Sequence, residues 1–159
     1  MRIVKADLSN PRHGVAVLEV LDAYAADPMG GNHPLSAFTR SHLIDALRQR
    51  PTIHVFLAFD GEQGVALANC IEGFSTFACR PLLNIHDLAV VASHRGRGIA
   101  RQLIAAVEQH ARASDCCKIT LEVLEGNAVA RKLYAACGFA GYELDPAAGK
   151  AMFLQRILD

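Results

Sequence analysis

The pattern of apolar and polar positions changes its period several times along the chain, and each change predicts a secondary-structure element. Apolar residues around Ile3 and Val4 indicate a first strand. Asn10 and Pro11 then signal a helix start, because asparagine caps a helix end and proline suits the first helical position. Apolar residues at helical spacing predict the face of this helix that packs on the core: Val15, Leu18, Leu21 and Ala25.

A second helix and a pair of strands follow. A stretch rich in Pro, Gly and Asn at 27–34 ends the first helix, and the second helix starts near Ser36 and is ended by Pro51. Two apolar runs at 53–59 and 64–75 indicate strands joined by an Asp-Gly-Glu-Gln turn, a typical hairpin signal. The loop at 27–34 is expected either to carry binding residues or to be a plain connector.

The stretch 82–111 is the most strongly patterned part of the chain. An apolar strand at 83–91 leads into the turn Arg-Gly-Arg-Gly-Ile-Ala at 95–100, and a helix follows. The spacing of apolar residues predicts the buried stripe of that helix: Ile99, Leu103, Ile104, Val107 and Ala111.

The remaining elements complete a mixed α/β order. Alternation at 118–124 predicts a strand, and Asn127 starts a short helix that ends at Gly138, a residue suited to the left-handed position after a helix. Two last strands are expected at 139–143 and 152–158. One stripe of the short helix is expected to face the core: Val129, Leu133 and Ala136. The order β-α-α-β-β-β-α-β-α-β-β predicts a layered mixed α/β domain.

Composition narrows the classes of protein that fit this pattern. The length of 159 residues suits one domain over 1–159. Sixteen basic and 16 acidic side chains give a formal net charge of zero, which argues against a nucleic-acid binder with a broad basic surface. The N-terminal residues lack a signal-peptide pattern, and no apolar run is long enough to span a membrane. We therefore expect a cytoplasmic protein with no membrane or nucleic-acid partner.

The cysteines argue against two kinds of cross-link. Five cysteines are an odd number, and none forms a C-x-x-C pair, so neither a disulfide framework nor a zinc site is indicated. We expect no metal. The simplest role for these residues is that of small buried hydrophobes: Cys70, Cys79, Cys116, Cys117 and Cys137.

The turn at 95–100 has the features of a phosphate-binding site. Gly96 and Gly98 allow a close backbone approach, and the next helix presents unpaired N–H groups with a partial positive charge. Arg95, Arg97 and Arg101 add fixed positive charge. A structural turn with solvated arginines is the alternative. The P-loop pattern is missing, and Arg101 stands where a dinucleotide-binding turn needs its third glycine.

Two motifs carry a family resemblance. The R-x-x-G-x-A at 95–100 resembles the [QR]-x-x-G-x-[GA] acyl-coenzyme A signature of the GNAT family of N-acetyltransferases. The N-x-x-A-x-x-L-Y-x-x-x-G-F at 127–139 is similar to a second motif of that family. The resemblance covers nearly the whole chain. It implies the GNAT fold, a central mixed and mostly antiparallel sheet flanked by about four helices, with acetyl-coenzyme A as co-substrate and no metal.

The resemblance also implies which residues meet the co-substrate. The backbone at 88–90 would pair with the pantetheine arm, and the turn would hold the pyrophosphate. The spacing of 127, 130 and 134 places these three positions on one stripe of their helix. The residues implied in cofactor binding are Leu88, Ala89, Val90, Arg95, Gly96, Arg97, Gly98, Ile99, Ala100, Arg101, Asn127, Ala130 and Tyr134.

The catalytic groups are only partly assigned. By resemblance Tyr134 is the general acid, and a phenol with an ordinary pKa of about 10 can protonate a leaving thiolate. Strand alternation places Asn84, His86 and Leu88 on one face, and a histidine can accept an amine proton near neutral pH. Two branches of the family carry a glutamate at 84 or at 86, and neither is present here. His86 is therefore expected to be the base, directly or through water, or else a structural histidine.

The expected acceptor is a primary amine. Asp87 would pair with a cationic substrate if a bulge re-aims it, and the remaining expected substrate contacts are Glu72 and Met29. Glu72 and Glu122 are fallback bases. We expect direct attack in a ternary complex, on a small molecule in preference to a peptide N-terminus or lysine. The alternative is a non-catalytic acyl-coenzyme A sensor or scaffold. Family analogy implies a homodimer.

Overall fold

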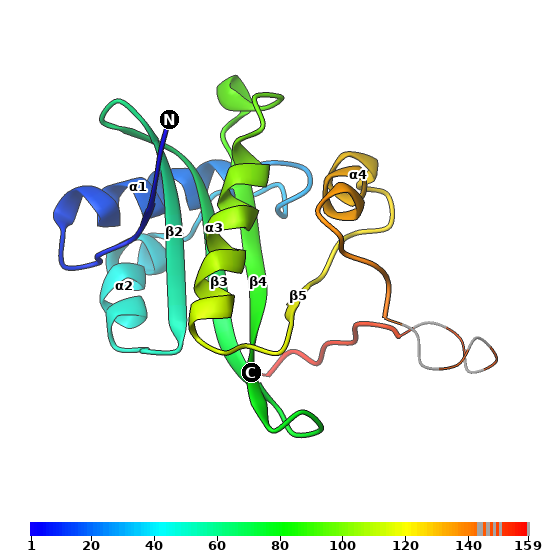
Figure 1. Ribbon diagram of the computed structural model, residues 1–159. Coiled ribbons are helices and arrows are strands. Elements are labelled where there is room, and N and C mark those ends of the chain that lie inside the picture. The colour runs from blue at the N-terminus through cyan, green and yellow to red at the C-terminus, as the bar shows by residue number, and fades with distance from the viewer. Residues whose placement is uncertain (143–144, 146, 148, 150, 159) are drawn as a thin grey trace. The chain divides into compact units, whose positions relative to one another are not determined.

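The chain forms two compact units, Met1–Leu121 and Glu122–Asp159. The computed structural model describes residues 1–142, 145, 147, 149 and 151–158. The first unit contains the sheet and its three covering α-helices, and the described residues of the second include the α-helix α4 (Figure 1). The single domain expected for residues 1–159 stays a prediction.

The sheet has five strands that follow one another in chain order. Neighbouring strands run antiparallel, except that the last pair is parallel. This is the mixed, mostly antiparallel sheet that the resemblance implies. Its strands are β1 (Arg2–Lys5), β2 (Ile53–Asp60), β3 (Gln63–Ser75), β4 (Arg80–Val90) and β5 (Ile119–Leu121).

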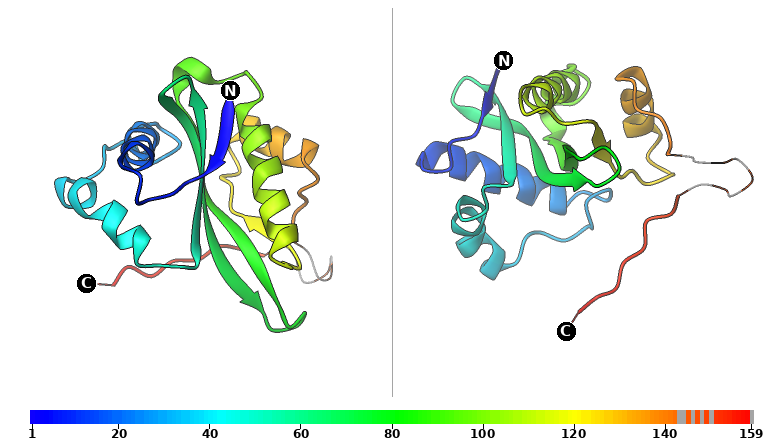
Figure 2. Two further views of the ribbon diagram at one scale, coloured as in Figure 1. Left: turned by 60° about the vertical axis from the view of Figure 1, so that its left-hand side comes forward. Right: turned by 60° about the horizontal axis from the view of Figure 1, so that its bottom comes forward.

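Helices cover both faces of the sheet in the first unit (Figure 2). Two helices lie on one face and a third lies on the other, and a single 3-10 turn, η1 (Ala92–His94), follows β4. The described residues of the second unit include one further helix, α4. The helices are α1 (Pro11–Ala25), α2 (Ala37–Arg48), α3 (Ile99–Ala113) and α4 (Ala128–Ala136). The expected mixed α/β fold is confirmed.

Several local predictions hold for clear physical reasons. The side chain of Asn10 accepts a hydrogen bond from the backbone of Arg12 and so caps α1. Ser36 caps α2 in the same way, through the N–H of Thr39. The apolar stripe of α3 is the predicted one, since its buried residues are Ile99, Leu103, Ile104, Val107 and Ala111.

The core between α1 and the sheet differs from the sequence prediction. Val15 is 54 % exposed, whereas Val17 and Val20 are each 1 % exposed. The buried face of α1 also includes the small residues Gly14 and Ala16, which let the helix lie close to the sheet. The prediction is therefore partly right, because Leu21 is buried in the core, but Val15 is not, and the buried face turns toward the small residues that a pattern of large apolar residues does not mark.

The expected strands late in the chain are also corrected. The strand expected at 118–124 is shortened to β5, and the described residues at 139–142 and 152–158 form no strand. Glu143 lies outside the described residues. Within the second unit no residue of α4 is buried, and the core-facing stripe expected for this helix stays a prediction. Strand formation requires a partner strand, which a local apolar pattern does not supply.

The two valines of α1 provide a matched test of this packing. We expect Val17→Ala to lower the free energy of unfolding by about 2 kcal/mol, because it leaves a cavity against β2 and β3. Val15→Ala removes the same atoms from an exposed position and should change it by less than about 0.5 kcal/mol. Urea denaturation of both variants measures the difference. Equal losses would show that the buried face of α1 is misassigned.

Candidate active site

A bulge in β4 re-aims the residues that the sequence singled out. Asp87 pairs with Asn69 of β3, but Ile85 pairs with the next residue, Cys70, so His86 is an extra residue without a partner on β3. Cross-strand partners share a face of the sheet, and neighbours along a strand alternate. Ile85 and Asp87 therefore point to opposite faces.

This bulge corrects the expected alternation along β4. Leu88 pairs with Ala68 and lies on the face toward α3, whereas Asn84 pairs with Ile71 and lies on the other face. The expectation that positions 84, 86 and 88 share one face is therefore wrong. The re-aiming of Asp87 that a bulge would cause is present in the structure.

A polar pair lies beside the bulge, on the face that α1 covers. The amide Nδ2 of Asn69 donates to Oδ2 of Asp87 over 3.1 Å. Oδ1 of Asn69 is buried and has no hydrogen-bond partner among the described residues. A buried acceptor without a donor is costly, and a ligand that donates a hydrogen bond there would remove that cost.

Tyr24, in the last turn of α1, belongs to the same region. Burial raises the pKa of Tyr24, and the negative charges of Asp87 and Asp27 raise it further. Its phenol therefore stays protonated at neutral pH and lies in a negative environment. The carboxylate of Asp87, a phenol and an unpaired amide oxygen make this region suited to a cationic group, while the charge of Asp27 is balanced by Arg95.

The outer edge of β4 is open beyond the bulge. The parallel ladder with β5 ends at the pair Ile85 and Leu121, so among the described residues no strand pairs with the outer edge of 87–90. An extended ligand can hydrogen-bond such an edge as an added strand does. Leu88, Ala89 and Val90, predicted to pair with a pantetheine arm, lie in this open stretch.

The turn after β4 presents backbone N–H groups at the start of α3. Gly98 is the N-cap residue of α3, has a φ of 73°, and supplies no side-chain cap. Only glycine adopts this left-handed conformation without strain, so φ, rather than crowding, explains the residue type. The uncapped N–H groups and the helix dipole make this end of α3 an anion-binding position.

The three arginines of the turn are in different environments. Arg95 donates from Nε to the backbone O of Val90 over 3.0 Å and forms an ion pair with Asp27 at 2.8 Å. Arg97 and Arg101 are exposed, and within the described residues the side chain of neither takes part in a hydrogen bond or an ion pair. Arg97 and Arg101 are therefore available to a phosphate, while Arg95 is already engaged.

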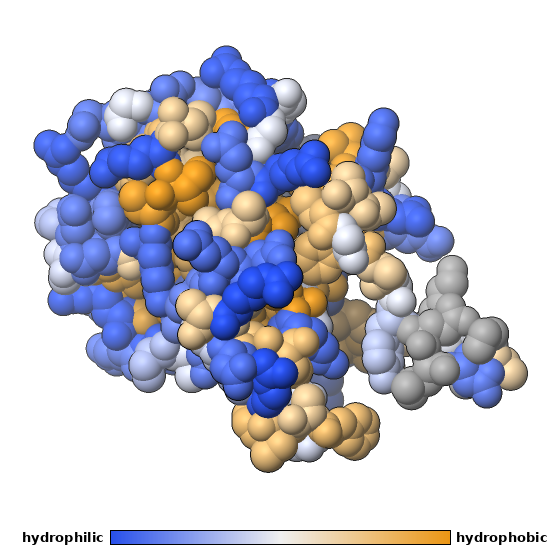
Figure 3. Space-filling model, viewed as in Figure 1, coloured by the Kyte–Doolittle hydropathy of each residue, from blue (hydrophilic) through white to orange (hydrophobic). Residues whose placement is uncertain are grey.

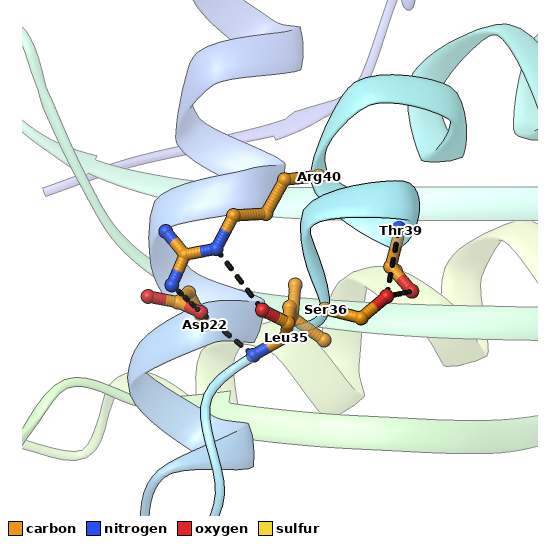
Figure 4. A network of polar contacts seen from close by, with 5 residues as sticks. All are labelled: Asp22, Leu35, Ser36, Thr39 and Arg40. Atoms are coloured by element: carbon orange, nitrogen blue, oxygen red, sulfur yellow. Dashed lines mark hydrogen bonds and ion pairs between the residues drawn. The ribbon is translucent and has the colours of Figure 1, made fainter.

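The loop between α1 and α2 is held at both ends. Near its start, the carboxylate of Asp27 accepts from the N–H of Met29, and this bond and the contact with Arg95 lower the pKa of Asp27. Near its end, Asp22 accepts from the N–H of Leu35 and forms an ion pair with Arg40 at 2.7 Å (Figure 4). Met29, a predicted substrate contact, lies in this loop and is 46 % exposed.

Not every residue predicted for the site lies beside Asp87 and the bulge. Glu72 lies on the α3 face of the sheet, where its carboxylate is 3.3 Å from Nε2 of His54, so the sheet separates it from Asp87. Among the cysteines, only Cys70 is buried, and Cys79 is exposed, so the expectation that all five are buried is wrong.

The second motif residues lie in the second unit. Asn127 caps α4, since its Oδ1 accepts from the N–H of Ala130 over 3.1 Å. The ring of Tyr134 meets that of Phe139 edge to face, with centroids 6.0 Å apart. Gly138 has a φ of 86°, as predicted for the residue after the helix.

Two residues of the site were missed by sequence reasoning, Asn69 and Tyr24, and the contact that Asp27 makes with Arg95 was missed as well. Asn69 is a polar residue within an apolar strand pattern, and this signal could have been used. Asp27 and Tyr24 carry no such local signal, because their roles depend on contacts with β4 and with the turn that follows it.

Neither a metal site nor a membrane span is found in the described part of the chain. No group of three or more His, Cys, Asp or Glu residues there could hold a metal ion. Within the same residues no helix is both long and apolar enough to cross a membrane. In the view of Figure 3, apolar colouring gathers at the tip of the β3–β4 hairpin, where Phe77 is fully exposed.

Comparisons with known proteins agree with this geometry. The sequence model of the Acetyltransferase (GNAT) family matches residues 18–139. An uncharacterized N-acetyltransferase of Bacillus subtilis, YycN, is 42 % identical over 55 residues, which are 35 % of this chain and 35 % of the relative. The aligned part is thus about a third of the curated relative's length.

Two solved structures share the fold. A probable acetyltransferase superposes with a TM-score of 0.84 at 21 % identity, over 100 % of this chain and 99 % of the other. An aminoglycoside acetyltransferase from an uncultured soil sample superposes with a TM-score of 0.78 at 17 % identity, over 99 % and 96 %. The family match spans most of the chain, and the chain belongs to the GNAT acetyltransferase family.

Proposed function

We propose that this protein is an acetyl-coenzyme A dependent N-acetyltransferase that acetylates a primary amine by direct attack in a ternary complex. The observation that carries the proposal is the continuity of the open edge of β4 with the uncapped N-terminus of α3. A long ligand with an amide-containing arm and a pyrophosphate matches these two features in that order.

The residues of the turn fit the co-substrate. When bound, acetyl-coenzyme A supplies an acetyl group activated as a thioester. The N–H groups at the start of α3 would bind its pyrophosphate, and the exposed Arg97 and Arg101 would neutralise further phosphate charge. The backbone of Leu88, Ala89 and Val90 would hold the arm and polarise the acetyl carbonyl through an N–H. In the second unit, Asn127, Ala130 and Tyr134 would line the thiol end.

The amine would bind on the α1 side of the bulge. The carboxylate of Asp87 would attract an ammonium group, and the unpaired Oδ1 of Asn69 would accept one of its hydrogens. Tyr24 and the loop residue Met29 would border this position. Such a site favours a small cationic amine over a neutral acceptor.

Proton transfer is assigned to two side chains. His86, the extra residue of the bulge, would accept the amine proton directly or through water, because it is exposed and has no partner on β3. Tyr134 would protonate the leaving thiolate. Cys70 follows Asn69 in β3 but lies on the opposite face of the sheet, away from the proposed amine position. Burial raises the pKa of Cys70 to about 12, so its thiol stays protonated and is no nucleophile.

The remaining parts of the proposal rest on analogy. A small-molecule acceptor is supported by the structural similarity to an aminoglycoside acetyltransferase, and a peptide amine is the second choice. A cytoplasmic homodimer is proposed from the family alone. A sensor that binds acetyl-coenzyme A without turnover is the alternative.

Thiol release tests the activity. Purified protein with acetyl-coenzyme A should release free coenzyme A only when an amine from a panel is added, and polyamines and aminoglycosides should be the better acceptors. Protein without co-substrate is the control, because exposed Cys79 also reacts with thiol reagents. Binding of acetyl-coenzyme A with no amine-dependent release would favour the sensor.

Tyr134→Phe separates catalysis from binding. We expect kcat to fall about 100-fold, because the thiolate loses its proton donor, while the Kd for acetyl-coenzyme A changes little. Steady-state kinetics and calorimetry measure the two quantities. A Kd weakened as much as kcat would show that the phenol is a binding group. Tyr142→Phe removes the same hydroxyl elsewhere in the second unit and is the matched control.

The pH dependence of kcat/KM tests His86. For the wild type we expect kcat/KM to rise with pH as the base loses its proton. His86→Ala should remove this limb, while Asp87→Asn should keep it and raise the KM for the amine about ten-fold. A profile that His86→Ala leaves unchanged would exclude His86 as the base.

A further inference from the structure

We infer that the side chain of Arg95 is a positioning group that couples the phosphate turn to the α1–α2 loop, so that binding of the co-substrate stabilises the wall of the amine site. This inference rests on the proposed function. It assigns to the first residue of the R-x-x-G-x-A motif a role separate from that of the turn's backbone.

The guanidinium of Arg95 bridges two elements. Its Nε donates to the backbone O of Val90 at the end of β4, and its terminal nitrogen donates to Oδ2 of Asp27 over 2.8 Å. Asp27 lies just beyond α1, 68 positions earlier in the sequence. The side-chain carboxylate of Asp27 is only 19 % exposed, so this ion pair is shielded from water on one side.

Asp27 in turn organises the loop. Its Oδ1 accepts from the N–H of Met29, and its backbone O accepts from the N–H groups of Gly30 and Asn32. Asp27 thus fixes three of the next five N–H groups. Any disturbance of Asp27 is therefore transmitted to the backbone of the loop.

The loop packs on the last turn of α1, which borders the proposed amine site. A Cβ at Gly30 would be 1.9 Å from the backbone O of Tyr24, so this part of the loop packs tightly on the last turn of α1. Tyr24 is the residue whose pKa is raised by burial and by the charges of Asp87 and Asp27. The contacts therefore run from Arg95 through Asp27 and the loop to Tyr24 in the last turn of α1, whose phenol is close enough to Asp87 for the charge of that carboxylate to raise its pKa.

Two features of the turn would allow it to bind a phosphate without the guanidinium of Arg95. The N–H groups at the start of α3 are uncapped, and Arg97 and Arg101 are exposed without partners among the described residues. A phosphate that orders the turn would also fix the backbone of Arg95, and with it the geometry of the Asp27 contact. By linkage, an amine held under the ordered loop would tighten binding of the co-substrate.

Hydrogen exchange of backbone amides measures this coupling with coenzyme A alone as the probe. In the wild type we expect saturating coenzyme A to slow exchange both at 97–101 and at Met29, Gly30 and Asn32, the latter by about five-fold or more. In Arg95→Gln, slowing at 97–101 should persist and slowing in the loop should be lost. Asp27→Asn should have the same effect, and the double variant should add nothing further.

Arg40→Gln is the matched control, because it also breaks an Arg–Asp ion pair that holds the same loop but does not touch the turn. In Arg40→Gln the loop amides should exchange faster than in the wild type when coenzyme A is absent. Added coenzyme A should still slow their exchange. The inference would be overturned if coenzyme A still protected the loop amides in Arg95→Gln. It would also be overturned if coenzyme A protected the turn but not the loop in the wild type. Absence of protection at 97–101 in the wild type would overturn the proposed function as well.

Discussion

The extra residue in β4 is the constraint on which the candidate site depends. Because His86 has no partner on β3, the strand changes the face to which its side chains point, and Asp87 comes to lie with Asn69 on the α1 side. The strand then continues without β5 beside it. One inserted residue thus creates a polar position on one face and an open backbone edge. A regular strand would have placed Asp87 on the face that α3 fills with Leu103 and Val107.

The rest of the first unit keeps this irregular strand in place. The core on the α1 face is built from Val17, Val20, Leu57 and Leu67, all at most 1 % exposed. The polar pair of Asn69 and Asp87 interrupts that apolar face near the end of α1. A buried amide oxygen without a partner weakens the fold, and the surrounding packing must offset this cost. The cost is understandable if the position serves a ligand.

The sequence predicted local features better than tertiary ones. Caps, the hairpin turn and the stripe of α3 depend on neighbouring residues, and all were predicted correctly. The face of α1 was only partly predicted, with Leu21 buried but Val15 exposed, because the small residues Gly14 and Ala16 also define it. The late strands were wrong because pairing needs a partner strand. The bulge was considered only as a condition on Asp87, since alternation carries no mark of an inserted residue. The contact between Asp27 and Arg95 spans most of the first unit, and no local pattern predicts it.

The arginines of the turn illustrate why a motif does not by itself assign roles. In the sequence alone, the three arginines are equivalent sources of positive charge beside a phosphate site: Arg95, Arg97 and Arg101. In the structure, only Arg97 and Arg101 are available to an anion, because Arg95 is bound to Val90 and Asp27. The backbone of the turn and the side chain of its first residue therefore serve different elements. If backbone N–H groups bind the phosphate, the guanidinium is available to join the turn to α1. The same short segment can then determine both where the co-substrate lies and how firmly the opposite wall is held.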